Sequence, residues 1–279
     1  MKYLNQKILF CQNQIACHFM NKPLKNESLI IFIPGGPCLS GKYLEYFAYT
    51  LSQQNEMNVG LLSLPNHDDS ILDGTELPLS YQRCLEFVRE MLDEVNIYTN
   101  KLILFGQSFG ARLAFDLLGY YEKNIPSVFL TGFPYQFEIS STLLNKLESL
   151  ENITDSNNSE EFNFQKTWEN MLPFYSYSSL PPDILEILSS NTRYKGNQKI
   201  LNYVPPIEET INRLEKRKSQ HHIAILQGEN DLVVPDNNIE KLKSLIPQAQ
   251  YFLIEKCGHF AMIEQQQKTL EAFSDFMNK

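Results

Sequence analysis

The sequence has neither a long apolar run nor an excess of positive charge, and both absences narrow what the protein can do. No stretch is apolar over enough residues to cross a bilayer, and residues 1–20 interrupt every apolar stretch with polar residues. We therefore expect no membrane span and no signal peptide. The 24 Lys and Arg residues are outnumbered by 33 Asp and Glu residues. The resulting net charge of -9 disfavours nucleic acid as a partner.

Cysteine is sparse and is not spaced for metal binding or for a disulfide framework. The five cysteines are odd in number and include no CxxC pair, so the sequence predicts no metal site. Free thiols persist in a reducing compartment, from which we predict a cytoplasmic protein. No dinucleotide-binding fingerprint is present, and we expect no cofactor. The expected partner is a small-molecule substrate, and nothing in the sequence indicates an oligomeric state.

The chain does contain short apolar runs that alternate with longer helical patterns. The runs predict buried strands at 29–33, 59–64, 101–105, 127–131, 223–227 and 250–254. Residues 2–10 and 14–20 are predicted to form an antiparallel entry ribbon. The periodic segments predict helices at 80–96, 109–121, 236–246 and 263–277. This order indicates an α/β fold, with helices on both faces of a mostly parallel sheet.

The segment 135–220 interrupts this alternation. It contains no convincing strand, but helical patterns occur at 139–151, 160–172, 181–191 and 206–218. A helical insertion between two parallel strands favours a cap, or lid, over the sheet edge where such folds bind ligands. A helical subdomain that only adds stability is the alternative. We therefore divide the chain into a core of 1–134 and 221–279 and a helical cap of 135–220.

The most informative motif is residues 106–110 (GQSFG), which follow a buried strand and precede a helix. A G-x-S-x-G sequence in this context is typical of a nucleophile elbow, in which a serine sits on a tight turn. The helix N-terminus adds backbone N–H groups and a positive dipole end beside the hydroxyl. Ser108 is therefore the predicted nucleophile. A tight turn with an incidental serine is the alternative.

A serine hydroxyl needs a base to remove its proton, and five histidines are available. His259 follows the strand 250–254 through a short loop that contains a glycine, so we expect it at the carboxyl edge of the sheet. His18 lies in a predicted strand, and the pair 221–222 begins one, at the opposite edge. His67, in a loop after a strand, is a weaker candidate. We predict that His259 is the base.

The base needs a carboxylate that fixes its tautomer. The strand 223–227 ends in the sequence GEND, which places Asp231 in a loop at the same predicted edge. The chain order serine, aspartate, histidine is the order of α/β-hydrolases. Glu229 and Asp236 are the rival acids. A turn or capping role for Asp231 is the alternative.

An oxyanion hole is predicted where the strand 29–33 ends in residues 34–38 (PGGPC). Two glycines between prolines allow a tight backbone with uncovered N–H groups, which can bind a developing negative charge. We predict that the backbone N–H groups of Gly36 and Phe109 are the donors.

These motifs together resemble the α/β-hydrolase superfamily, and within it the proline iminopeptidase-like branch of serine aminopeptidases and esterases. That branch has a His-Gly-Gly-Pro-Gly oxyanion loop, which this chain matches at residues 35–37. Pro34 replaces the histidine and Cys38 the last glycine. Residues 228–231 (GEND) and 258–259 (GH) match the acid and base motifs. The resemblance covers about 1–134 and 221–279.

The resemblance implies a serine hydrolase that cleaves a small ester, thioester or amide through an acyl-enzyme. An aminopeptidase of this branch also needs acidic cap residues that hold the free amine of its substrate, and Trp168-Glu169 faintly resembles a cap segment of the branch. We assign Trp168 and Glu169 to substrate binding on that basis. The alternatives are a proline iminopeptidase-type aminopeptidase, a carbon–carbon bond hydrolase and a non-catalytic ligand sensor.

Overall fold

The structure is a computed structural model. It describes residues 7–10, 15–20, 27–37, 39–54, 57–65, 67–70, 79–96, 99–121, 126–138, 140–148, 166, 168–190, 198–217 and 222–278. Cys38, His221 and most of the predicted helix 160–172 lie outside these residues.

Eight strands form one sheet in the order β1-β2-β4-β3-β5-β6-β7-β8. The strands are β1 (Lys7–Phe10), β2 (Ala16–Phe19), β3 (Glu27–Ile33), β4 (Asn58–Leu62), β5 (Thr99–Gln107), β6 (Ser127–Thr131), β7 (Ile223–Gly228) and β8 (Gln250–Ile254). The pairs β1–β2 and β2–β4 are antiparallel, and every pairing from β4 through β8 is parallel. The predicted α/β architecture, a mostly parallel sheet with helices on both faces, is confirmed, as are the entry ribbon and all six predicted core strands.

The central strands contain continuous apolar runs because both faces of the sheet are covered. In β3, Leu29 and Ile31 face one hydrophobic cluster, whereas Ile30 and Phe32 face the other. Successive side chains of a strand point to opposite faces, so a strand with a helix layer on each side needs a continuous apolar run.

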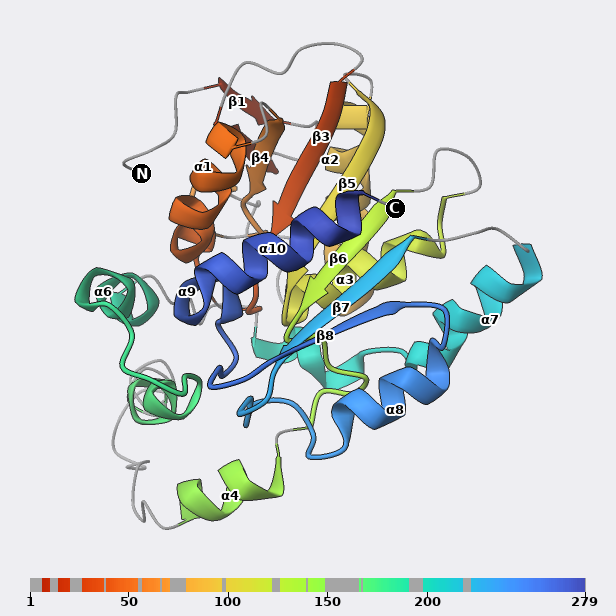
Figure 1. The fold of residues 1–279 in the computed structure, drawn as a ribbon. Coiled ribbons are helices and arrows are strands. Elements are labelled where there is room, and N and C mark those ends of the chain that lie inside the picture. The colour runs from red at the N-terminus through yellow and green to blue at the C-terminus, as the bar shows by residue number, and fades with distance from the viewer. Residues whose placement is uncertain are drawn as a thin grey trace.

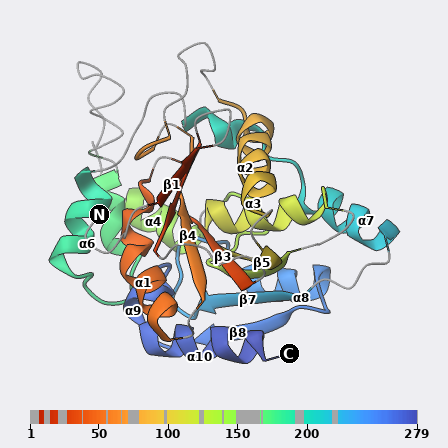
Figure 2. The same cartoon turned by 90° about the horizontal axis from the view of Figure 1, so that it is seen from above.

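The two helix layers are visible in Figures 1 and 2. One face carries α2 (Tyr81–Asn96), α3 (Phe109–Leu118), α7 (Ile207–Arg217) and α8 (Asn238–Leu245). The other face carries α1 (Glu45–Gln54), α9 (Ala261–Glu264) and α10 (Gln266–Met277). The predicted helix 263–277 is therefore two helices, broken at Gln265.

The helix α1 was missing from the sequence prediction. Its buried residues Phe47, Ala48 and Leu51 are spaced for one helical face. Aromatic residues and a threonine weaken its helical propensity, and its polar C-terminal half gives no clear capping signal. Packing against β4 and the preceding 3₁₀ helix η1 (Gly41–Leu44) stabilises it instead.

Between β6 and β7 the regular elements among the described residues are helices, as predicted. They form α4 (Ser141–Glu148), the 3₁₀ helix η3 (Leu172–Phe174), α6 (Pro182–Ser190), the 3₁₀ helix η4 (Gln198–Tyr203) and α7. The last of these packs on α3, and its Ile207 and Leu214 belong to the core cluster under the sheet. The helix α7 therefore joins the core layer, although it lies inside the predicted cap range.

A buried arginine of α3 holds both ends of this inserted segment. The guanidinium of Arg112 donates to the carbonyl oxygen of Tyr135, where the insertion begins, and to that of Pro205, just before α7. Its Nε donates to Asp116 over 3.0 Å. The same carboxylate accepts hydrogen bonds from the hydroxyls of Tyr81 and Thr210. Every group in this buried network therefore has a partner, as a buried charge requires.

We predict that Arg112→Met lowers the free energy of unfolding by about 3–5 kcal/mol, because it leaves the Asp116 carboxylate buried without its counter-charge. Urea unfolding followed by circular dichroism measures the change. Arg83→Met is the control, since Arg83 pairs with Glu86 at the surface and such pairs contribute about 0–1 kcal/mol. Equal losses in the two variants would contradict the prediction.

Candidate active site

The predicted nucleophile occupies a strained turn between β5 and α3. Ser108 has φ 53° and ψ −117°, a conformation that a residue with a side chain rarely adopts. Its backbone N–H donates to the Thr131 carbonyl over 2.8 Å, which fixes the turn against β6. The Ser108 side chain makes no capping hydrogen bond to α3. The hydroxyl is therefore left available at the sheet edge, as in a nucleophile elbow.

The turn depends on a close backbone approach at Gly110. A Cβ at this position would clash with the carbonyl oxygens of Ile33 and Pro34. Only glycine lets the first turn of α3 lie directly against the end of β3. The N-terminus of α3, with the Phe109 N–H, therefore lies beside the loop that follows β3.

His259 and Asp231 meet at the same edge, as the sequence predicted. Nδ1 of His259 lies 2.8 Å from Oδ2 of Asp231, and both side chains are almost completely buried. The other carboxylate oxygen accepts the N–H of Val233 over 2.9 Å. Because a carboxylate only accepts, Nδ1 carries the proton and Nε2 of the neutral ring has a free lone pair. Within the described part of the chain, Nε2 is buried and has no hydrogen-bond partner.

The rival residues lie elsewhere or have other partners. His18 pairs with Asp69 over 3.1 Å, and burial lowers the pKa of its ring. Nδ1 of His67 donates to the Pro65 carbonyl. Of the rival acids, Glu229 is exposed and Asp236 accepts hydrogen bonds from Ser141.

His222 and Cys257 are both packing groups in the structure. The ring of His222 stacks on Phe276, at the opposite end of β7 from Asp231. The Cys257 thiol is buried, and burial raises its pKa, so it stays a neutral packing group.

The predicted oxyanion loop lies beside the elbow and lines the cavity. Gly36 has φ 148°, which favours glycine, and it lines the cavity together with Ser108. The N–H of the neighbouring Gly35 is not available, because it donates to the hydroxyl of Tyr43 over 2.7 Å. Of the two glycines of this loop, Gly36 is therefore the one whose N–H is not bound to Tyr43.

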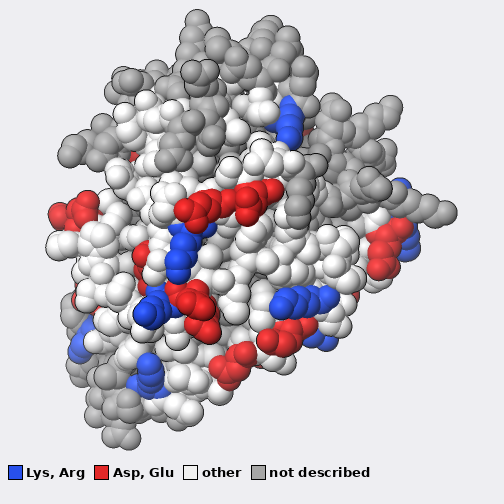
Figure 3. All heavy atoms as spheres, viewed as in Figure 1, with Lys and Arg blue, Asp and Glu red and all other residues white. Residues whose placement is uncertain are grey.

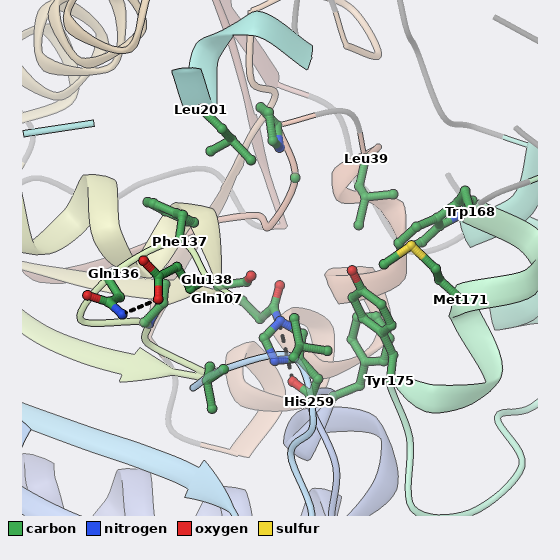
Figure 4. A pocket seen from close by; sticks show the side chains of 17 residues that line it. Leu39, Gln107, Gln136, Phe137, Glu138, Trp168, Met171, Tyr175, Leu201 and His259 are labelled. Carbon is green, nitrogen blue, oxygen red and sulfur yellow. Dashed lines mark hydrogen bonds between the residues drawn. The ribbon is translucent and has the colours of Figure 1, made fainter. Parts of the chain in front are cut away.

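A mainly apolar cavity of about 280 Å³ opens above Ser108 and His259. Figure 4 shows Trp168, Met171 and Tyr175 on one side of it and Phe137 on the other. Burial raises the pKa of the Tyr175 hydroxyl, and the nearby Asp231 carboxylate adds to this. Tyr175 is therefore a neutral wall of the cavity.

The two predicted substrate-binding residues separate in the structure. Trp168 is buried, lines the cavity and donates its indole N–H to the Leu188 carbonyl. Glu169 is exposed and is not among the lining residues. The carboxylate that does line the cavity is Glu138, which accepts a hydrogen bond from Gln136 over 2.6 Å. The sequence did not predict a role for Glu138, because the loop after β6 that contains it carries no recognisable motif.

The loop that carries His259 is held by a second carboxylate. Glu264 accepts the backbone N–H groups of Gly258 and Phe260, on either side of His259, over 3.1 and 3.3 Å. It also accepts the N–H of Tyr177 over 2.6 Å, and the His259 N–H donates to the Tyr175 carbonyl over 2.6 Å. The inserted segment and the loop of His259 are therefore one hydrogen-bonded unit.

Two further features of the described residues are the distribution of surface charge and the length of the apolar helices. On the face in Figure 3, basic side chains lie next to acidic ones rather than in a separate basic patch. None of the described helices is both long and apolar enough to cross a membrane.

The fold, the elbow serine and the histidine–aspartate pair define the class of the protein. A model of the alpha/beta hydrolase fold family matches residues 28–266, and the chain belongs to this family.

Lipase 1 of Psychrobacter immobilis is 23% identical over 178 residues, which are 61% of this chain and 54% of the relative. The chain therefore spans about half the length of the curated relative that it matches. An esterase from Exiguobacterium antarcticum superposes with a TM-score of 0.75 at 14% identity, covering 98% of this chain and 99% of that chain. A meta-cleavage product hydrolase from Pseudomonas fluorescens gives 0.72 at 16% identity, covering 100% and 99%. At these identities the structural likeness shows the fold alone.

We predict that Glu264→Gln lowers kcat about tenfold, because an amide cannot accept all three N–H groups and the His259 loop shifts. Steady-state hydrolysis of an activated ester measures the change. Glu271→Gln is the matched control, since Glu271 contacts Gln267 on the exposed side of α10. An unchanged kcat in Glu264→Gln would show that this carboxylate does not position His259.

Proposed function

We propose that the protein is a serine hydrolase that cleaves a small, largely apolar ester, thioester or amide by two-step acyl transfer. One observation carries the proposal. The buried 2.8 Å contact between His259 and Asp231 leaves Nε2 as an unpaired base in the same cavity as the elbow hydroxyl of Ser108.

In the acylation step, Oγ of Ser108 forms a bond to the substrate carbonyl carbon while its proton passes to Nε2 of His259. The carbonyl electron pair moves onto oxygen, and the N–H groups of Gly36 and Phe109 stabilise the negative charge. The intermediate collapses as the bond to the leaving group breaks. The leaving group takes the proton from His259, and Asp231 stabilises the imidazolium in the interval.

In the deacylation step, water attacks the acyl carbon and gives a proton to His259. The bond between the acyl carbon and Oγ then breaks, and His259 returns the proton to Ser108. The two halves use the same base and the same oxyanion donors, so no metal or cofactor takes part in the proposed mechanism.

The walls of the cavity support a neutral, apolar acyl group. Trp168, Met171 and Leu201 come from the inserted segment, and Leu39 and Val234 come from core loops. An apolar wall favours a substrate with an apolar acyl group. Removing carbon atoms from water is favourable, whereas removing a charge from water is not. The names of the relatives, a lipase and an esterase, agree with ester substrates.

The same lining supports a lid formed by the inserted segment. Trp168, Met171, Tyr175 and Leu201 of this segment line the cavity, and Tyr175 and Tyr177 contact the His259 loop. We propose that the lid ends before α7, which packs on α3 as part of the core.

The buried free cysteines Cys17 and Cys84 fit the proposed reducing, cytoplasmic location.

An aminopeptidase of the proline iminopeptidase type is the second candidate, and Glu138 is the observation that favours it. Its carboxylate lines the cavity, where a substrate ammonium could pair with it. The side chain is exposed, so solvent weakens such a pair. We therefore place this candidate second.

Ser108→Ala is expected to abolish turnover and covalent labelling by a fluorophosphonate while leaving the melting temperature near that of the wild type. The reason is that the hydroxyl makes no capping bond and its loss removes only the nucleophile. Ser244→Ala, an exposed serine in α8, is the control and should label fully. Residual activity above a few per cent in Ser108→Ala would refute the assignment of the nucleophile.

We expect the enzyme to hydrolyse N-acetyl-proline naphthyl ester at least as well as the proline ester with its free amine, because the cavity is mainly apolar. The ratio of kcat/KM for the two esters measures the preference. A preference for the free amine of about tenfold or more would favour the aminopeptidase. In that case Glu138→Gln should remove the preference, and Glu169→Gln, whose side chain is outside the cavity, should keep it.

A further inference from the structure

Three buried hydrogen bonds, which join two side chains and two backbone groups, connect the loops of the proposed active site. The Gly35 N–H donates to Oη of Tyr43 over 2.7 Å, and this hydroxyl donates to Oε1 of Gln107 over 2.7 Å. Nε2 of Gln107 then donates to the carbonyl oxygen of His259 over 3.3 Å. The chain of hydrogen bonds runs from the oxyanion loop, past the residue before the nucleophile, to the base.

The direction of this chain of hydrogen bonds is fixed at both ends. The Gly35 N–H can only donate, and the His259 carbonyl can only accept. The amide of Gln107 must therefore point its NH₂ group at His259, which leaves its oxygen for the proton of Tyr43. Burial raises the pKa of the Tyr43 hydroxyl, so the proton stays in place. No other arrangement satisfies all four groups.

Tyr43 is itself held in position from two sides. It belongs to η1, whose first residues are fixed by Asp68, which accepts from the Ser40 hydroxyl over 2.7 Å and from the Gly41 N–H over 3.2 Å. Its ring packs edge-on against Phe260, with ring centroids 5.7 Å apart. The hydroxyl is therefore a rigid acceptor for the oxyanion loop, and it does not line the cavity.

We propose that Tyr43 and Gln107 are positioning residues that hold the Gly36 N–H in register with Ser108 and His259 for transition-state stabilisation. The inference rests on the proposed acyl-transfer function. Pro34 has no side-chain group that could hydrogen-bond the loop, so the support comes from Tyr43. Because the Gly35 N–H is bound to Tyr43, we assign the oxyanion contact to the N–H of the neighbouring Gly36, a residue that lines the cavity with Ser108.

A structural role alone would give a different outcome from a positioning role. Loss of a buried hydrogen bond destabilises the fold wherever it occurs. Loss of oxyanion alignment lowers kcat and weakens transition-state binding, but it spares the binding of the ground state. The experiment therefore compares a ligand that forms an oxyanion with one that does not.

The test is Tyr43→Phe, which keeps the ring against Phe260 and removes only the hydroxyl. We expect kcat to fall about ten- to hundredfold with KM changed less than about threefold. The affinity for a trifluoromethyl ketone, which forms a hemiketal oxyanion on Ser108, should fall in parallel. The affinity for the matching methyl ketone should stay unchanged. Tyr251→Phe, which removes a hydrogen bond to the Ile246 carbonyl far from the cavity, should change none of these.

Gln107→Leu tests the same chain of hydrogen bonds from its other end and serves if Tyr43→Phe does not fold. If the two residues act as a unit, kcat of the double variant should be no more than about twofold lower than kcat of the worse single variant. Amide hydrogen exchange at Gly35 should speed up in Tyr43→Phe. A Tyr43→Phe variant that keeps the wild-type kcat, or whose affinity falls equally for both ketones, would overturn this inference but not the proposed function. A wild-type protein with neither turnover nor labelling of Ser108 would instead overturn the proposed function, and the inference with it.

Discussion

The close contact between the first turn of α3 and the end of β3 is the constraint on which the candidate site depends. At Gly110 the helix backbone lies directly against the carbonyl oxygens of Ile33 and Pro34, with no room for a side chain. This contact brings two independent backbone segments together, the N-terminus of α3 and the loop after β3. The proposed oxyanion hole takes one N–H donor from each segment, and it depends on this contact because a side chain at Gly110 would separate them.

The second half of the site is assembled by the parallel sheet rather than by local contact. Parallel strands end at one edge, so β7 and β8 deliver Asp231 and His259 to the edge where β5 delivers Ser108. The fine position of His259 comes from further hydrogen bonds, since Glu264 holds the backbone on both sides of it. The sheet thus brings the residues near one another, and buried polar contacts set the geometry.

The sequence predicted the elements whose signals are local and failed where the determinant is tertiary. The elbow, Asp231 and His259 were found because each follows a strong strand signal and matches a short motif. The helix α1 was missed because packing on β4 stabilises it more than its own propensity. The position of Glu138 and the hydrogen bond from Gly35 to Tyr43 also could not be predicted from the sequence. They join residues that only the folded loops bring together.

The burial of Asp231 and His259 explains how an apolar cavity can support charge separation. In the proposed acylation step, bulk water cannot stabilise the imidazolium, so the stabilising groups must already be in place. The Asp231 carboxylate meets Nδ1 and the Val233 N–H before any substrate arrives. On the substrate side, the proposed mechanism assigns the corresponding role to the N–H groups of Gly36 and Phe109. Because these groups are held by the fold, little reorganisation is needed when the proton leaves Ser108.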